Sequence, residues 1–164
     1  MPNKRTIAKA RRDKREGKSA STQAGEFVHE EIDKIRRGRH GARSTKQAIA
    51  IGLSEARRAG VDLPPPKRGR TSGRTRKSAR YAYEAGQGRR KPRRPRLSRA
   101  VSRALKREPR GTVSRQALSR QARSAASRRS AAQRSASARK AVRTKGAHAR
   151  SAAARKAART RARD

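Results

Sequence analysis

The basic residues that follow a run of three prolines have the types and spacing of a phosphate-binding segment. Residues 67–77 read K-R-G-R-T-S-G-R-T-R-K, and Arg68 and Arg70 flank a glycine. Arginine binds phosphate oxygens through paired hydrogen bonds, and it enters the narrow minor groove of A·T-rich DNA, where the negative potential is enhanced. The segment therefore predicts contact with a nucleic-acid backbone, and any sequence specificity would be a preference for A·T-rich duplexes through Arg68 and Arg70.

A second basic segment, K-P-R-R-P-R at residues 91–96, is likewise broken by prolines. Because both segments are short of apolar residues, we expect them to present their charges to a polyanion rather than to a core. The predicted nucleic-acid-binding residues are Lys67, Arg68, Arg70, Arg74, Arg76, Lys77, Arg89, Arg90, Lys91, Arg93, Arg94 and Arg96.

Few residues could support catalysis. Glu30 and Glu31 are adjacent in a predicted helix, so their side chains point about 100° apart and cannot address one substrate atom together. His40 has no metal-site spacing to the other two histidines, and we expect it to be an exposed loop residue. The chain has no cysteine. We therefore expect no catalytic residues, no metal site, no cofactor and no enzymatic activity.

The charge and the apolar residues are distributed in opposite directions along the chain. The 164 residues include 50 Lys and Arg against 11 Asp and Glu, for a formal net charge of +39. Residues 67–164 hold 34 of the basic residues and only 3 acidic ones, but only 6 of the 17 Leu, Ile, Val, Met and Phe residues. The predicted fold is mainly α, with a small N-terminal helical hairpin followed by a long, largely disordered basic tail that contains helix-prone segments.

The clearest helix signal lies between Ser44 and Gly60. Ser44 and Gln47 have capping-box spacing, and Gly60 supplies a C-terminal stop before the prolines. Its apolar residues Ile49, Leu53 and Ala56 recur with helical period. A partner helix is predicted over residues 23–37, where Val28, Ile32 and Ile35 have the same spacing, and a short basic helix is predicted over residues 4–16.

These patterns divide the chain into five predicted parts, which differ in charge and apolar content. The two short helices expected in the fourth part are residues 98–107 and 114–126. The five parts are a basic N-terminal arm (1–20), the helical hairpin (21–63), a Pro/Gly/Arg-rich linker with an AT-hook-like segment (64–96), a weak second helix pair (97–126) and an Ala/Arg/Ser-rich basic tail (127–164).

Three resemblances accompany this organisation. Residues 4–66, with the core Q-A-I-A-I-G-L-S-E-A, resemble a family of small basic bacterial proteins of unknown function that are sometimes labelled DNA-binding. The R-G-R at residues 68–70 resembles the core of an AT-hook, although Thr71 stands where that motif has a second proline. The tail resembles bacterial histone H1-like proteins in composition, but its 37 Arg against 13 Lys are closer to protamine.

The expected function is that of a cytoplasmic, nucleoid-associated protein that binds DNA largely without sequence specificity, for compaction or protection. Double-stranded DNA is the main expected partner, and RNA is the second candidate. The alternatives are an RNA- or ribosome-associated protein, or a protein-interaction module localised by its basic tail. The hairpin also allows self-association. No membrane partner is expected, because no apolar run approaches the ~20 residues of a membrane span.

Overall fold

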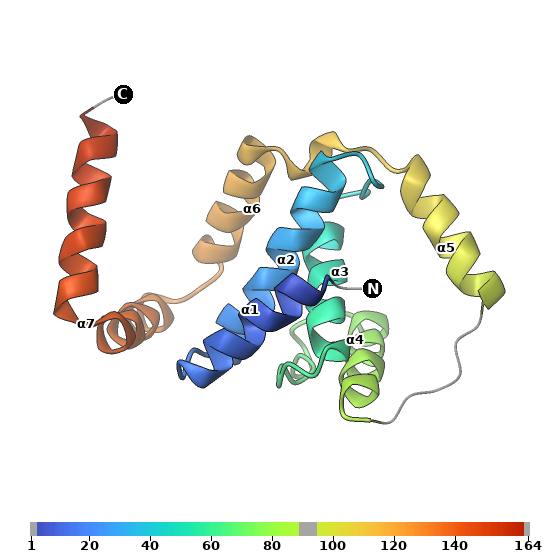
Figure 1. Cartoon of the computed structure of the whole chain (residues 1–164), viewed down its shortest axis with the longest axis horizontal. Coiled ribbons are helices and arrows are strands. Elements are labelled where there is room, and N and C mark those ends of the chain that lie inside the picture. Colours follow the sequence, from blue (N-terminus) through green and yellow to red (C-terminus); the bar gives the residue numbers. More distant parts are fainter. Residues whose placement is uncertain (1–2, 89–94, 163–164) are drawn as a thin grey trace. The chain divides into compact units, whose positions relative to one another are not determined.

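The computed structural model describes residues 3–88 and 95–162. In this part of the chain, seven α-helices and one 3-10 helix follow one another (Figure 1). They divide into two compact units, residues 1–121 and 122–164, which we describe separately. The elements are α1 (Lys4–Arg15), α2 (Ala20–Arg36), α3 (Thr45–Arg58), α4 (Gly73–Gly86), α5 (Pro95–Arg107), η1 (Gly111–Val113), α6 (Arg115–Ser127) and α7 (Ala131–Arg161).

The pair formed by α2 and α3 is the centre of the first unit and confirms the two main predicted helices. The buried residues of α3 are the small residues Ala48, Gly52 and Ala56 together with Arg57 at its C-terminal end. Of the predicted stripe, Ala56 is buried, whereas Ile49 and Leu53 are half-buried. A Cβ atom on Gly52 would lie only 2.6 Å from the Cα atom of Val28 in α2. The backbones of α2 and α3 therefore approach closely because small residues of α3 lie at the contact.

The predicted cap of α3 is present, but only half of the predicted capping box forms. The Ser44 hydroxyl accepts a hydrogen bond from the backbone N–H of Gln47 at 3.2 Å. The Gln47 side chain does not return the bond to Ser44 and instead accepts from the N–H of Arg43 at 2.7 Å. The backbone N–H groups of Arg43 and Gln47 thus both have side-chain acceptors. Such acceptors are needed at a helix start because the first N–H groups of a helix have no partner within it.

On either side of this pair, α1 packs against α2 and α4 packs against α3 (Figure 1). The helix α4 begins at Ser72, whose hydroxyl accepts from the N–H of Thr75, and it buries Ala79 and Ala82. At its end, a Cβ on Gly86 would overlap the carbonyl oxygen of Arg57. Small residues again allow the close approach, so α4 needs no large apolar side chain to pack.

The short helix η1 completes the core between α2 and α3. Val113 is fully buried in a cluster with Ile35, Ala42 and Ala48. The Thr45 hydroxyl donates to the carbonyl of Thr112 at 2.6 Å, which fastens η1 to the start of α3. A residue from the basic half of the sequence therefore contributes to the core of the N-terminal helices.

The predicted long, largely disordered tail is wrong. Residues 73–86, 95–107, 115–127 and 131–161 are helical, and α5 and α6 coincide with the two short helices expected from the sequence. The prediction for the last segment gave too much weight to charge repulsion. Alanine and arginine are strong helix formers. Like-charge pairs four positions apart, such as Arg139–Arg143 and Arg155–Arg159, cost only about 0.2–0.5 kcal/mol each, which this propensity offsets. Ser130 and Gln133 also form a complete capping box at the start of α7.

Candidate nucleic-acid interface

The predicted phosphate-binding segment after the prolines forms an exposed turn that leads into α4. The N–H of Arg70 donates to the carbonyl of Lys67 at 3.3 Å, and Gly69 has a φ of 81°. The segment therefore turns in this structure, and an extended course along a minor groove requires the turn to open. The exposed basic side chains of this turn and of the first turns of α4 are Lys67, Arg68, Arg70, Arg74, Arg76 and Lys77.

The second predicted segment falls largely outside the described residues. Of its members, Arg96 is described, and it is exposed at the start of α5. The same helix carries four further exposed basic residues, Arg99, Arg103, Lys106 and Arg107, which the sequence analysis did not select. The predicted residues that lie outside the described ranges are Arg89, Arg90, Lys91, Arg93 and Arg94.

The second unit contains the basic helix α7. Every residue of α7 whose side chain is described is exposed to solvent. Between residues 109 and 163 the sequence has 17 basic residues and no acidic residue. This helix therefore carries a high positive charge that no carboxylate within residues 109–163 offsets.

The acidic residues, in contrast, are paired within the N-terminal helices. Lys18 and Lys34 each contact two or more carboxylates, so a few basic residues account for most of the pairs. In these pairs, Arg80 lies beyond residue 66 and the other basic partners precede it. The pairs in the described residues include Asp13–Lys18 (2.7 Å), Glu16–Lys18 (2.8 Å), Glu16–Arg12 (3.6 Å), Glu26–Lys9 (3.7 Å), Glu30–Lys34 (3.0 Å), Glu31–Lys34 (3.9 Å), Glu55–Lys34 (3.1 Å) and Glu84–Arg80 (2.9 Å).

A cluster of ionisable side chains joins α2, α3 and the loop between them. Lys34 bridges Glu30 and Glu55, which lie on different helices. Glu31 is 1% exposed, and its Oε1 atom accepts no hydrogen bond but lies 3.5 Å from Nε2 of His40. His40 lies in the loop, as predicted, but the prediction that it is exposed is wrong, because its side chain is 19% exposed and faces this buried carboxylate.

The surroundings shift the pKa values within this cluster in different directions. Burial raises the pKa of Glu31, although the charges of His40 and Lys34 partly oppose this effect. Burial alone would raise the pKa of Glu30 and lower that of Lys34. Hydrogen bonds from Lys34, Thr6 and Asn3 outweigh the effect of burial on the pKa of Glu30, and the contacts of Lys34 with Glu30 and Glu55 outweigh it on the pKa of Lys34. The pKa of Glu30 is therefore lowered and that of Lys34 is raised, as expected for an ion pair.

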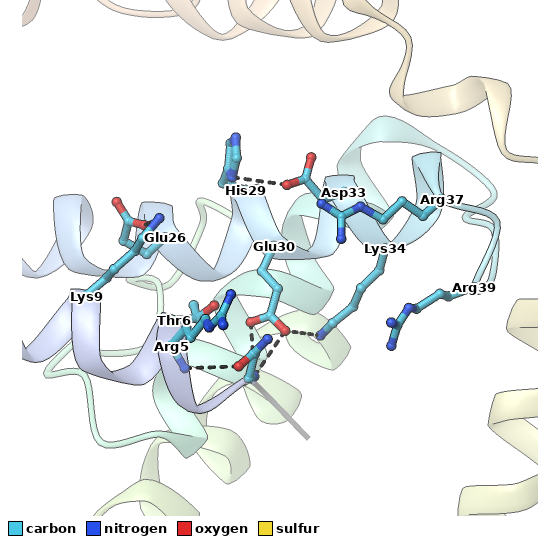
Figure 2. Close-up of a pocket in the computed structure, with 11 residues that line it drawn as sticks. Arg5, Thr6, Lys9, Glu26, His29, Glu30, Asp33, Lys34, Arg37 and Arg39 are labelled. Atoms are coloured by element: carbon cyan, nitrogen blue, oxygen red, sulfur yellow. Dashed lines mark hydrogen bonds and ion pairs between the residues drawn. The ribbon is translucent and has the colours of Figure 1, made fainter.

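A shallow pocket of about 270 Å³ lies beside this cluster, between the start of α1 and α2. Figure 2 shows Glu30 at its centre, with Lys34 on one side and the start of α1 on the other. The backbone N–H of Asn3 donates to Glu30 at 3.1 Å, so this carboxylate fastens α1 to α2. His29 lies 3.5 Å from Asp33, its neighbour one turn later. The Asn3–Glu30 contact joins two helices and the His29–Asp33 contact lies within α2, and neither places a nucleophile next to a base.

Replacing Glu31 with glutamine is expected to raise the free energy of unfolding at neutral pH by about 1 kcal/mol, because a buried oxygen without a hydrogen bond then loses its charge. The pKa of Glu31 is raised in the folded state above its ordinary value of 4.5, so the folded protein takes up this proton first as the pH falls. Protonation therefore removes the cost of the buried charge, and the parent protein gains stability in this pH range. The difference in unfolding free energy between Glu31→Gln and the parent should therefore shrink on acidification. Urea unfolding followed by circular dichroism at several pH values measures this difference.

Glu30→Gln is the matched control for this prediction, since the pKa of Glu30 is lowered. A lowered pKa contributes stability above the unfolded-state value, and that stability is lost as the pH falls. We therefore expect Glu30→Gln to destabilise the protein at neutral pH. A Glu31→Gln variant that is less stable than the parent at neutral pH contradicts the assignment.

Neither a metal cluster nor a membrane-spanning helix is present in the described parts of the chain. No group of three or more His, Asp or Glu side chains within residues 3–88 and 95–162 could hold a metal ion. Across the same ranges, no helix is both long and apolar enough to cross a bilayer.

The described residues thus form a basic structure whose regular elements are all helices, and a comparison with known proteins finds a match for its N-terminal part. Residues 3–68, which contain α1 to α3, match a family of unknown function (DUF6496). This confirms the expected resemblance of residues 4–66 to a family of unknown function, and the match carries no activity. No curated protein and no solved structure matches the chain.

Proposed function

We propose that this protein binds double-stranded nucleic acid through its phosphate backbones, with DNA as the main partner and little sequence specificity. The observation that carries the proposal is the exposed, basic α7, in a stretch with 17 basic residues and no acidic residue. A helix with this charge favours a polyanionic partner. In the cell, such binding would associate the protein with the nucleoid, where it would compact or protect DNA.

Counterion release supplies the physical basis for this binding. Each basic residue that neutralises a phosphate displaces a condensed cation from the duplex, and affinity then falls steeply with salt. The predominance of arginine adds to this, since its planar guanidinium binds phosphate oxygens in pairs. Residues 67–164 hold 34 of the 50 basic residues and only 3 of the 11 acidic ones, so the charge available for such contacts lies mainly after residue 66.

The aromatic residues favour a duplex over a single strand as the partner. Proteins that bind single strands stack bases on exposed aromatic rings. The chain has three aromatic residues. Phe27 is fully buried, the hydroxyl of Tyr83 donates to Asp62 at 2.7 Å, and only Tyr81 is exposed, at 42%. One exposed ring does not provide a stacking platform.

Competition binding tests the proposal. A fluorescent DNA duplex is bound by the full chain at low salt, and unlabelled duplex DNA, structured RNA, single-stranded DNA and polyglutamate are added as competitors. The proposal predicts displacement in the order duplex DNA, structured RNA, single-stranded DNA and polyglutamate, from most to least effective. Preferential displacement by RNA favours the RNA-associated alternative. If polyglutamate competes as well as DNA, the protein has no nucleic-acid site.

The turn at residues 67–70 predicts a preference for A·T-rich sequences. Arg68 and Arg70 are both exposed and flank Gly69, so opening of the turn would let them enter a narrow minor groove. Replacing both with alanine is expected to abolish any A·T preference and to weaken binding to mixed-sequence DNA less than tenfold, since two of many phosphate contacts are lost.

The matched control replaces Arg74 and Arg76, which are equally exposed at the start of α4. This control should weaken binding to both DNA sequences alike and leave their ratio unchanged. Anisotropy titrations with A·T-rich and G·C-rich duplexes of equal length measure the ratio. A double Arg68/Arg70 variant that keeps the parent's A·T preference contradicts the assignment.

A further inference from the structure

The helix α7 contains a sequence repeat with the same basic residues in both copies. Residues 134–145 read R-S-A-S-A-R-K-A-V-R-T-K, and residues 150–161 read R-S-A-A-A-R-K-A-A-R-T-R. Nine of the 12 positions are identical, and the last position is basic in both copies. Each copy therefore carries five basic residues at matching positions. We name these segments copy 1 (134–145) and copy 2 (150–161).

The structure separates the two copies into two helical segments. Gly146, between them, has a φ of 65° and a ψ of 170°, which interrupts the helix (Figure 1). The first arginine of each copy donates to a backbone carbonyl at the break that precedes the copy: Arg134 to Arg129, five residues earlier, and Arg150 to Gly146, four residues earlier. Both copies are therefore helical segments that begin just after a break in the helix.

The basic residues of a copy lie on two sides of its helix. At about 100° per residue, Arg155, Arg159 and Lys156 lie about 140°, 180° and 240° around the axis from Arg150. Arg161 returns to within about 20° of Arg150. Copy 1 has the same spacing of basic residues. This arrangement suits contact with phosphates on more than one side, such as the two backbones that border a groove.

We propose that copies 1 and 2 are two equivalent binding modules for the phosphodiester backbone of a duplex. This inference rests on the proposed function and goes beyond it, because it assigns the affinity to two defined segments that contribute equally. If net charge alone determined DNA affinity, any five exposed basic residues of the chain would contribute as much to it as one copy does.

Neutralising each copy in the full-length chain tests this inference. The five basic residues are replaced with glutamine in copy 1, in copy 2 or in both, since glutamine is also a good helix former. Each single-copy variant is expected to reduce the slope of log K against log salt by the same amount, up to about 4.5, and the double variant by the sum. Circular dichroism verifies that helix content is kept. The replaced residues are Arg134, Arg139, Lys140, Arg143 and Lys145 in copy 1, and Arg150, Arg155, Lys156, Arg159 and Arg161 in copy 2.

Two controls make the test specific. Replacing the arginines of copy 1 with lysine keeps the charge and should leave the slope unchanged. Replacing five exposed basic residues of α1 with glutamine removes the same net charge and should change the slope little; these residues are Lys4, Arg5, Arg11, Lys14 and Arg15.

The outcomes separate the two proposals. If the α1 variant lowers the slope as much as a copy variant, or if the two copies differ in effect, the inference is overturned while DNA binding stands. If the parent chain does not bind duplex DNA at low salt, the proposed function itself fails.

Discussion

Gly52→Ala is expected to lower the free energy of unfolding by about 1–3 kcal/mol, the usual cost of overpacking a core. The added Cβ would lie 2.6 Å from Cα and 2.9 Å from the backbone N of Val28. Both atoms belong to the backbone of α2, so no side chain can rotate away and the two helices must separate. Urea unfolding followed by circular dichroism at 222 nm measures the loss.

Gly25→Ala is the matched control for this variant. Gly25 lies inside α2, is exposed and has no atom within 4 Å of the position that a Cβ would take. Alanine should therefore raise stability there by about 0.5–1 kcal/mol, because glycine loses more backbone entropy in a helix. Opposite signs for the two substitutions support the close packing of α2 on α3. Equal stabilisation by both contradicts it.

Removal of residues 122–164 is expected to weaken duplex DNA binding at least about a thousandfold at 150 mM salt, because this unit carries 14 of the 50 basic residues. The buried core residues all lie before residue 122, so the shortened chain should keep its helical core. Anisotropy titrations measure the affinity, and circular dichroism with thermal unfolding verifies the core. A shortened chain that binds within tenfold of the parent contradicts the proposed importance of α7.

The sequence predicts α2 and α3 well because their signals are local. The cap at Ser44 and the helical spacing of the apolar residues require only neighbouring positions, and both helices are found. The helix α4 could not be predicted in the same way. Its packing depends on Ala79, Ala82 and Gly86, which carry little hydrophobic signal but allow close approach to another helix.

Contacts between distant residues also escaped sequence analysis. Val113 joins the core of α2 and α3 from a part of the chain with few apolar residues. Lys34 and Glu55 meet across two helices, and His40 approaches Glu31 through the loop. Their side chains are brought together only once the helices pack. The repeat in α7, in contrast, was visible in the sequence, where a comparison of residues 134–145 with 150–161 reveals it.

The predicted nucleic-acid-binding residues remain a prediction. Those that the structure describes are exposed, as binding requires. The selection ended at Arg96, however, before the predicted helix pair (97–126) and the predicted basic tail (127–164). The ordered, exposed α5 and α7 extend the basic surface well beyond the residues that were selected.

The salt dependence of duplex DNA binding by the full-length chain tests the central claim most directly. Affinity would be measured by anisotropy between about 50 and 400 mM salt, and log K plotted against log salt. The proposal predicts a slope of about −6 or steeper, which corresponds to six or more neutralised phosphates. A slope shallower than about −2, or no binding at the lowest salt, would show that phosphate contacts by the basic helices are not the main source of affinity.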